Sequence, residues 1–554
     1  PLFLLDGSPV VHDTYFKNPV TNIEGWHTLL MVPYGRGGAG FSTIDVTDTN
    51  KPLHLYSILN DPISEQILRV DHNANLFKYN YASSRFNITN FNEVQTAENN
   101  VGSSNACNAS GNTSCYRSNV WSLSLDFDAS IDYKIYANGR DVTTSTTIAN
   151  INGIYKFTFN QSYKYDASGN SASDSINITQ TGSLDSAGQD YDYRYLGETW
   201  GSPRVFRMPN NGAGDNNILD DEYVAVLTGG YGNGSPLIGS NVYVIDWLTG
   251  KVKKEIKIED KGYDSNSRND ITNSIPSSPI VINADAANSN YSGAIVYVND
   301  LEGKITKINL TNMDQTPEYD PNTNTFSTQK KPVNLYDKYT MFDTMASSEN
   351  NNRYMFHSMD AGIGVVTKKL WLFGGTGNFM NLDDQQVNLQ KVNNVMFGIK
   401  DYSFPNFGTA SNTQSPDNFL KCNNTTNDIT GASCPDIGDR GWYVELDKQK
   451  KVVNEPTLKG NIVYYPLYRP ANYFDPLRPN FITTLNQSCG GGNAYICAVD
   501  GECGSNKSNK IGDINQGEQC LYVGTGILSK VVAFGLNLYA NISGESTNED
   551  KTDI

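Results

Sequence analysis

The chain has 554 residues and a formal net charge of −17. This length exceeds what one compact core needs, so we expect one large repeat domain or several smaller ones. The acidic balance argues against nucleic-acid binding, because such proteins need a cationic surface that displaces counterions from the phosphates. No apolar stretch approaches the roughly 20 residues that span a bilayer, so we expect no transmembrane segment.

Tyrosine, phenylalanine, glycine, asparagine, serine and threonine are abundant, whereas long runs of Ala, Leu, Glu and Lys are missing. This composition favours short strands joined by many turns over helices. The first residues, PLFLLDGSPVV, contain neither an initiator Met nor a basic region. They are therefore not predicted to be a signal peptide, and we expect the chain to derive from a longer precursor.

A recurring pattern of a strand, an Asp, a short turn and a second strand predicts β-hairpins. The copies are GFSTIDVTDTNKPLHLYSI (40–58), VYVIDWLTGKVKKEIKI (242–258), VYVNDLEGKITKINL (296–310), GWYVELDKQKKVVNEP (441–456) and AYICAVDGECG (494–504). In the third copy, Gly303 supplies a turn position where φ can be positive, and Asp300 can hydrogen-bond the turn backbone.

A second recurring element is a strand that runs into glycines. It occurs as TLLMVPYGRGGAG (28–40), YVAVLTGGYGNG (223–234), LWLFGGTGNF (370–379) and CLYVGTGIL (520–528). Such a strand followed by a hairpin makes most of a four-stranded blade. Repetition at irregular spacing predicts an all-β fold, a β-propeller of six or seven blades whose first blade is possibly incomplete. The alternative is an array of β-sandwiches.

The pattern divides the chain into segments. Residues 1–60 form a first propeller segment, and 191–540 form the remainder with a loop excursion at about 402–439. Between them, 61–190 contain neither element but keep alternating segments, which predicts a β-rich insertion. This insertion is rich in Tyr, Asn and Ser, so we expect it to provide the outward binding surface. Residues 541–554 are predicted to be a flexible tail.

The eight cysteines indicate disulfides rather than a metal site. No CxxC pair occurs, and the five histidines lie far from the cysteines in sequence, so zinc is poorly supported. The predicted bridges are Cys107–Cys115, Cys422–Cys434 and two of open connectivity among Cys489, Cys497, Cys503 and Cys520. Local disulfides predict an oxidising compartment and an exported protein; free buried thiols are the alternative.

No catalytic motif is recognised in the sequence. GRGGAG (35–40) satisfies G-x-G-x-x-G, but the β-branched run FSTIDVTD follows where a dinucleotide site needs a helix, so we interpret it as a turn. The loop DASGNSASD offers oxygen ligands at alternating positions, which suggests calcium; a plain polar loop is the alternative. Its candidate ligands are Asp166, Ser168, Asn170 and Asp174.

The ordered motifs resemble the C-terminal β-propeller domain of the PilC/PilY family of type IV pilus tip adhesins. They are LLDGSPVVHDTYF (4–16), WHTLLMVPYGRGGAGFSTIDVTD (26–48), YLGETWGSPRV (195–205), LTGGYGNG, SIPSSPIVIN (274–283), YVNDLEGKITKINL, FGGTGNFM, FGIKD (397–401), GWYVEL and CGGGNAYICAVDG (489–501). The resemblance implies an extracellular protein at the pilus tip, with minor pilins as partners and a surface or host ligand.

The family carries a calcium loop just before its counterpart of YVNDLEGK, where this chain has NADAANSNYSGA (283–294). By that resemblance, Asn288 and Asn290 match inner ligand positions. Ala286 and Ala294 replace the carboxylates at the ends of the loop, and Asp285 would substitute through a shift of one residue.

The predicted function is therefore a non-enzymatic adhesin and pilus biogenesis protein that mediates surface attachment. One alternative is a propeller scaffold for a secreted protein complex. The other is a quinoprotein-type dehydrogenase, a class that uses similar hairpins; the vicinal Cys-Cys that some of those enzymes carry is missing from this sequence.

Overall fold

The computed structural model describes residues 5–81, 83–88, 115–123, 133–137, 140–141, 143, 146–151, 154–163, 176–181, 189–208, 222–232, 238–258, 273–283, 293–311, 313–314, 319–320, 325–326, 331–332, 335–344, 353–382, 394–408, 420–421, 441–446, 449–470, 492–514 and 518–544. The chain divides into two compact units: Pro1–Pro62, Leu68–Phe77 and Tyr193–Ile554 form unit 1, and Ile63–Ile67 and Lys78–Asp192 form unit 2.

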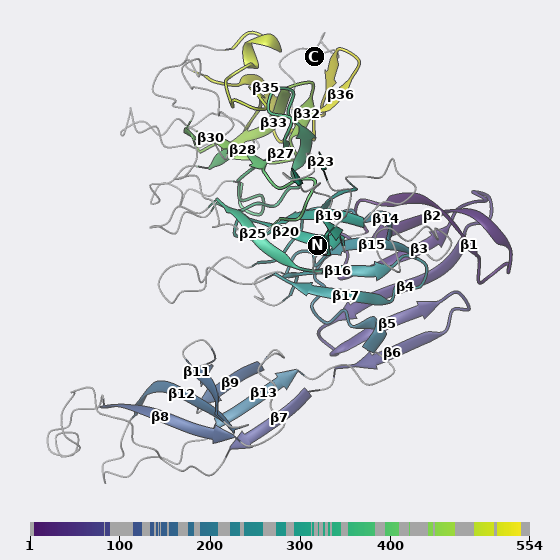
Figure 1. Cartoon of the computed structure of the whole chain (residues 1–554), viewed down its shortest axis with the longest axis vertical. Coiled ribbons are helices and arrows are strands. Elements are labelled where there is room, and N and C mark those ends of the chain that lie inside the picture. The colour runs from purple at the N-terminus through teal and green to yellow at the C-terminus, as the bar shows by residue number, and fades with distance from the viewer. Residues whose placement is uncertain are drawn as a thin grey trace. The chain divides into compact units, whose positions relative to one another are not determined.

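Unit 2 contains two sheets, as a β-rich segment requires (Figure 1). One has the order β10-β9-β13-β7 and the other the order β11-β12-β8. The strands are β7 (Ser83–Ile88), β8 (Cys115–Leu123), β9 (Tyr133–Ala137), β10 (Arg140–Asp141), β11 (Thr147–Ile151), β12 (Ile154–Tyr163) and β13 (Ile176–Thr181).

The first sheet of unit 1 is a six-stranded antiparallel meander in chain order. Its strands are β1 (Val10–Lys17), β2 (Glu24–Pro33), β3 (Gly40–Asp45), β4 (Leu53–Asp61), β5 (Gln66–Asp71) and β6 (Leu76–Asn80). The last two strands lie beyond residue 60, where the sequence predicts the insertion to begin. A short turn after β4, with Glu65 at a φ of 52°, lets the chain double back and extend the sheet.

Two four-stranded sheets follow, and in both of them the strands pair in chain order. The connection to the last strand of the third sheet contains short additional strand pairs. The second sheet contains β14 (Arg204–Met208), β15 (Glu222–Thr228), β16 (Asn241–Asp246) and β17 (Val252–Lys257). The third contains β18 (Ile280–Ile282), β19 (Gly293–Asn299), β20 (Lys304–Thr311) and β25 (Lys338–Asp343). The short pairs between β20 and β25 are β21 (Met313–Asp314) with β24 (Lys331–Pro332), and β22 (Tyr319–Asp320) with β23 (Thr325–Phe326).

The fourth and fifth sheets have five strands each. The fourth contains β26 (Asp360–Ile363), β27 (Leu370–Gly375), β28 (Val395–Asp401), β30 (Gly441–Glu445) and, parallel to β30, β29 (Leu420–Lys421). The fifth contains β31 (Lys451–Val452), β32 (Thr457–Lys459), β33 (Ile462–Arg469), β34 (Asn493–Asp500) and β35 (Leu521–Thr525). A two-stranded hairpin, β36 (Val532–Phe534) and β37 (Asn537–Tyr539), ends the described chain.

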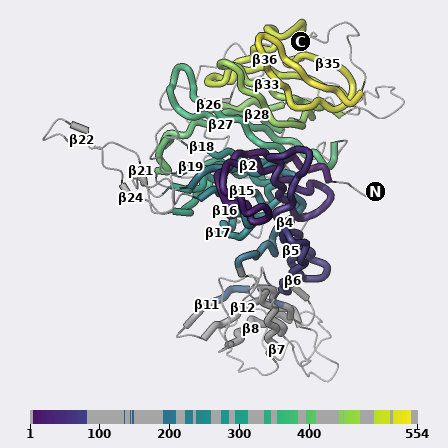
Figure 2. Tube along the Cα trace, turned by 90° about the vertical axis from the view of Figure 1, so that its right-hand side faces the viewer, coloured from purple at the N-terminus to yellow at the C-terminus, as the bar shows by residue number. Residues whose placement is uncertain are grey.

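Each sheet of unit 1 packs against the next one along the chain. The first sheet lies beside the second (Figures 1 and 2), where the Tyr56 hydroxyl donates to Trp247 O at 3.0 Å. One core cluster contains apolar side chains of the second and third sheets, another those of the third and fourth, and another those of the fourth and fifth. This all-β succession fits the predicted class of fold. Among the described residues no closed ring is formed, so closure and blade number stay predictions.

The first strands of successive sheets are linked to one another. Ser202 N donates to Ser278 Oγ, and Ser278 N donates to Ser358 Oγ, both at 2.8 Å. Further along, Thr457 Oγ1 donates to Val531 O at 2.5 Å, which attaches β36 beside β32. The hairpin β36–β37 therefore lies beside the fifth sheet.

The predicted Asp turns are confirmed. Lys304 N donates to Asp300 Oδ1 at 3.0 Å, and Gly303 has a φ of +80°. Asp246 and Asp500 each accept two turn amides in the same way. A strand that ends in Asp thus satisfies the turn backbone with its own side chain.

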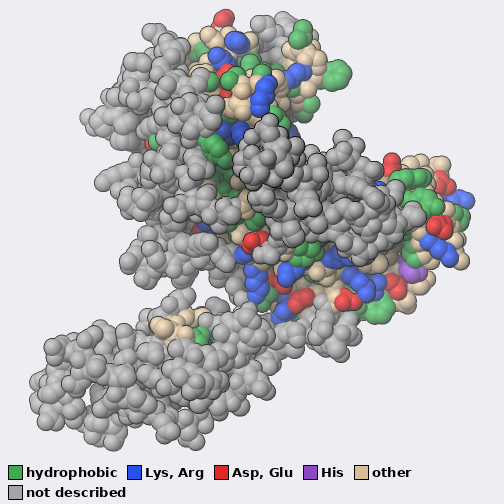
Figure 3. Space-filling model, in the orientation of Figure 1, with side chains coloured by type: hydrophobic (Ala, Val, Ile, Leu, Met, Phe, Trp, Pro, Cys, Tyr) green, Lys and Arg blue, Asp and Glu red, His purple; other side chains and the backbone are tan. Residues whose placement is uncertain are grey.

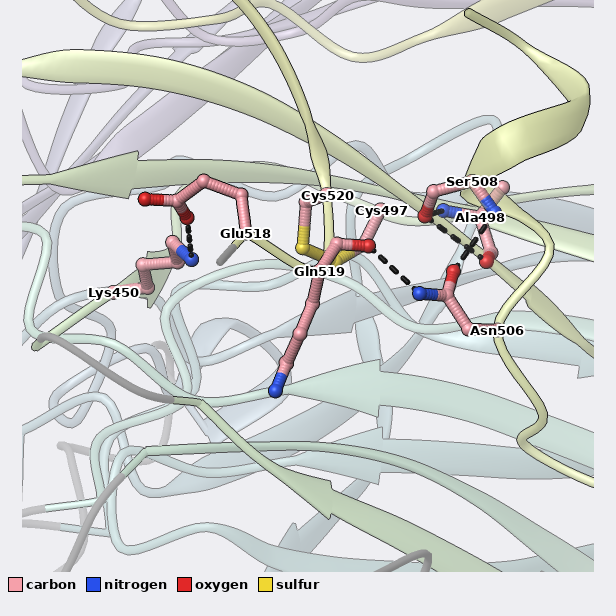
Figure 4. The surroundings of a disulfide bond; sticks show 8 residues. All are labelled: Lys450, Cys497, Ala498, Asn506, Ser508, Glu518, Gln519 and Cys520. Carbon is pink, nitrogen blue, oxygen red and sulfur yellow. Dashed lines mark hydrogen bonds and ion pairs between the residues drawn. A yellow bond between two sulfur atoms is a disulfide. The ribbon is translucent and has the colours of Figure 1, made fainter. Parts of the chain in front are cut away.

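The fifth sheet contains a disulfide between Cys497 in β34 and Cys520 just before β35, with Cα atoms 4.5 Å apart (Figure 4). Beside it, Asn506 Nδ2 donates to Gln519 O at 2.8 Å. Cys503 is also disulfide-bonded. This confirms one bridge within the group of four cysteines. Cys107, Cys422, Cys434, Cys489 and the side chain of Cys115 lie outside the described residues.

Candidate functional site

The predicted calcium ligands lie outside the described residues, so calcium binding stays a prediction. These residues are Asp166, Ser168, Asn170 and Asp174 in one loop and Asp285, Asn288 and Asn290 in the other. Within the part of the chain that the structure describes, no group of three or more His, Cys, Asp or Glu side chains gathers to hold a metal ion.

The loops that carry the glycine motifs converge at one end of the sheets. In an antiparallel meander, the first strand begins at the edge where the second strand ends. The GRGGAG segment lies between β2 and β3 as a turn, as predicted, and not at the start of a helix. The loops after β15 and β27 and the loops that lead into β14 and β26 lie at the same edge of their sheets. We call this edge the loop end.

Backbone hydrogen bonds at the loop end connect loops within and between the first four sheets, and we call this series the backbone belt. The donor and acceptor pairs are Gly35 N to Thr199 O (3.1 Å), Tyr231 N to Glu198 O (2.8 Å), Gly230 N to Ile275 O (3.0 Å), Leu301 N to Ser274 O (2.9 Å), Met355 N to Leu301 O (3.4 Å) and Gly377 N to Tyr354 O (2.8 Å). Loops held in this way form a scaffold rather than independent segments.

Glycine is required in the belt because the backbones approach closely. A Cβ on Gly230 would lie 2.2 Å from the carbonyl oxygen of Glu198, and its φ is +86°. Gly35, with a φ of +61°, would place a Cβ 2.4 Å from Gly7 N. Both positions exclude a side chain by space and by backbone conformation. The glycines thus allow neighbouring loops at the loop end to approach closely.

Aromatic side chains project from the belt and gather over a small buried core. Leu301 and Phe356 are 4% and 6% exposed, and partly buried side chains pack against them. The set of partly buried rings, which we call the aromatic surface, is Trp200, Tyr231, Tyr354 and Phe379. These rings come from loops of the second and fourth sheets, so the surface exists only when the sheets are assembled.

Arg36 of the first sheet lies within this group. Its guanidinium carbon is 4.9 Å from the centroid of Trp200 and 6.0 Å from that of Phe379. Trp200 in turn stacks on Tyr231, with centroids 4.9 Å apart and an interplanar angle of 29°. A cation between aromatic rings is stabilised by their quadrupoles. This stack joins a loop of the first sheet to a loop of the fourth.

Polar groups accompany the rings. Trp200 Nε1 donates to Glu198 Oε2 at 2.9 Å. Burial, with the Glu198 carboxylate adding to it, raises the pKa of Tyr231, while Arg36 acts in the opposite direction. His357 lies edge-on to Phe379 with centroids 4.9 Å apart, and burial lowers its pKa to about 4. The imidazole is therefore neutral at physiological pH.

A buried charged group lies directly beneath the aromatic surface, on the turn that carries Leu301. Asp300, Glu302 and Lys304 are each 2% exposed or less. Lys304 pairs with Glu302, and its Nζ lies 4.0 Å from Asp300 Oδ2. Burial raises the pKa of Asp300 to about 8, with Lys304 opposing the shift and Glu302 adding to it. This arrangement fixes the turn, because Asp300 also accepts a hydrogen bond from Lys304 N.

The sequence identified the glycine motifs but not the aromatic surface. Each ring stands alone beside glycines or within an entry loop, as in ETWGSP, GGYGNG and GTGNFM. Recurrence of an aromatic residue next to successive glycine motifs was the available signal. The histidines at 12, 27, 54, 72 and 357 were predicted to be scattered, and only His357 contacts this surface.

The chain is similar to a solved structure. No family model matches the chain, and no curated protein matches it. The "Crystal structure of Pseudomonas aeruginosa PilY1 C-terminal domain" is similar at 13% sequence identity with a TM-score of 0.46. The match covers 98% of this chain and 84% of that one.

Proposed function

We propose that the chain is a non-enzymatic component of a type IV pilus tip that mediates attachment to surfaces. The observation that carries the proposal is the ordered set of motifs described above, from LLDGSPVVHDTYF to CGGGNAYICAVDG. Several of these motifs, among them GRGGAG, GETWGSP and FGGTGNFM, supply residues of the backbone belt. The resemblance therefore concerns residues that join the sheets, which supports a common architecture.

The proposed location is extracellular, at the pilus tip or the outer cell surface, with minor pilins as partners. The disulfide between Cys497 and Cys520 supports an oxidising compartment. Among the described residues, no helix is long and apolar enough to cross a membrane. On the face drawn in Figure 3, acidic and basic side chains of the described residues lie interspersed, as on a solvated surface. Calcium is the ligand proposed for the two predicted loops.

A second candidate function is a scaffold that binds another secreted protein. The observation that favours it is the hairpin β36–β37, on which Val532, Phe534 and Leu536 are 55%, 76% and 103% exposed. Exposed apolar side chains in such number are typical of protein contacts. This candidate requires no surface attachment, which separates it experimentally from the adhesin.

The test is attachment of piliated cells that lack the chain. We expect the deletion strain to lose attachment and the complemented strain to regain it. A second strain carries a variant in which residues 82–188 are replaced by a short Gly/Ser linker, which leaves β6 and the first sheet intact. Loss of attachment by this variant would assign the contact to the insertion. If the deletion strain assembles pili and attaches at the wild-type level, the adhesin proposal is wrong.

A further inference from the structure

The aromatic surface is more exposed than the tryptophans in the cores of the sheets. Trp247, Trp371 and Trp442 are fully buried in the sheets, whereas Trp200 and its neighbours are only partly buried. Their loops are held by the hydrogen bonds of the backbone belt, which fix the positions of the rings. Rigid, partly exposed aromatic rings provide contact area at low entropic cost. This combination is typical of recognition.

The polar groups around the rings limit what the surface can bind. Arg36 offers planar donors, Glu198 offers acceptor oxygens, and neutral His357 offers one donor and one acceptor. The Nε2 atom of His357 is buried and has no hydrogen-bond partner among the described residues. Arg36 and Glu198 therefore place donors and acceptors beside the apolar ring surfaces.

The charges at the site and on the whole chain restrict the class of ligand further. Arg36 and Glu198 carry opposite charges beside Trp200, so the site has little net charge of its own. The chain as a whole carries a net charge of −17, which disfavours an anionic ligand. The guanidinium among the rings disfavours a cationic one. A neutral ligand with an apolar face and several hydroxyl groups satisfies both conditions.

We propose that the aromatic surface binds a neutral glycan. The C–H face of a pyranose ring packs on Phe379 and Tyr354, and its hydroxyl groups exchange hydrogen bonds with Arg36 and Glu198. This inference rests on the proposed function, since it names the ligand class through which the adhesin would attach. It also places the contact on the loop end rather than on the insertion.

Tryptophan fluorescence tests the proposal in the purified full chain. Trp26 is 65% exposed, and the side chain of Trp121 lies outside the described residues. The variant Trp26→Phe/Trp121→Phe retains Trp200 together with the three tryptophans buried in the sheets. Titration with a panel of neutral oligosaccharides is expected to give a saturable change in emission, which reports on Trp200.

Two variants in this background locate the site. Phe379→Ala and Tyr354→Ala are each expected to weaken binding by about tenfold, because each removes one aromatic contact. Tyr15→Ala is the matched control: this tyrosine is 50% exposed on β1, outside the aromatic surface, and its loss should leave affinity unchanged. Circular dichroism and the melting temperature establish that each variant is folded.

Three results would overturn the proposal. They are no saturable change with any neutral oligosaccharide, unchanged affinity in both Phe379→Ala and Tyr354→Ala, and binding confined to acidic glycans or apolar peptides. The attachment assay is independent of this titration. If the purified chain binds glycans but the deletion strain attaches normally, the adhesin function is wrong and the glycan site is supported. If the deletion strain loses attachment but the purified chain binds no glycan, only the glycan site is rejected.

Discussion

A buried ion pair between the third and fourth sheets gives the sharpest test of how unit 1 is held together. Lys307 in β20 is 0% exposed and its Nζ lies 2.7 Å from Asp401 Oδ2 at the end of β28. The Tyr297 hydroxyl donates to the same oxygen at 2.5 Å. Burial, with Asp401 adding to it, raises the pKa of Tyr297 well above its usual value, so the phenol stays a donor.

The substitution Lys307→Met would leave the Asp401 carboxylate buried without its cation. We expect a loss of about 3–5 kcal/mol in the free energy of unfolding, the usual result of removing one partner of a buried pair. Tyr297→Phe removes one hydrogen bond to a charged acceptor and should cost about 1.5–3 kcal/mol. Urea unfolding followed by tryptophan emission measures both, since Trp247, Trp371 and Trp442 report on unit 1.

Two controls accompany this measurement. In the background of Lys307→Met, Asp401→Asn removes the unpaired charge but keeps the oxygen that accepts the Ser403 amide, so part of the lost stability should return. Lys253→Met breaks the more exposed pair with Glu222 and should cost less than about 1 kcal/mol. If Lys307→Met costs no more than Lys253→Met, the ion pair does not join the sheets as we infer.

Three further predictions concern the loop end and the fifth sheet. The substitution Gly230→Ala should lower the free energy of unfolding by several times the roughly 1 kcal/mol expected for Gly460→Ala. The reason is that a Cβ at Gly230 would meet Glu198 O, whereas a Cβ at Gly460 would meet nothing within 4 Å. Equal melting temperatures of the two variants would contradict this. Because His357 is buried in its neutral form, the free energy of unfolding should fall as the pH drops from the unfolded pKa of about 6.5 towards about 4. The substitution His357→Gln should flatten this pH dependence in urea titrations from pH 7 to 4. Replacing both Cys497 and Cys520 by Ala should cost about 3 kcal/mol by opening a loop of 23 residues; an unchanged urea midpoint would argue against the bridge.

Local sequence patterns predicted the hairpins well because their determinants are local. The Asp300 side chain and Gly303 act within one turn, and alternation of apolar residues defines the strands on either side. The strands β5 and β6 were assigned to the insertion instead, since they carry neither the Asp turn nor the glycine motif. Only the pairing of β5 with β4, and of β6 with β5, places them in the first sheet.

The contacts between sheets could not be predicted from the sequence. The belt joins Gly35 to Thr199, and the buried pair joins Lys307 to Asp401, across separations that carry no periodic signal. A lysine inside an alternating strand is usually expected on the solvent side. Its burial becomes apparent only when the neighbouring sheet supplies the carboxylate. The aromatic surface was missed for the same reason, because its rings meet only after the sheets assemble.

The central claim is that the chain works at the tip of a type IV pilus. Immunogold electron microscopy of piliated cells, with an antibody against the chain, measures its position directly. We predict gold particles at the free ends of the filaments, and none on the filaments of the deletion strain. Label confined to the cell body, on cells whose pili are intact and unlabelled, would contradict the claim.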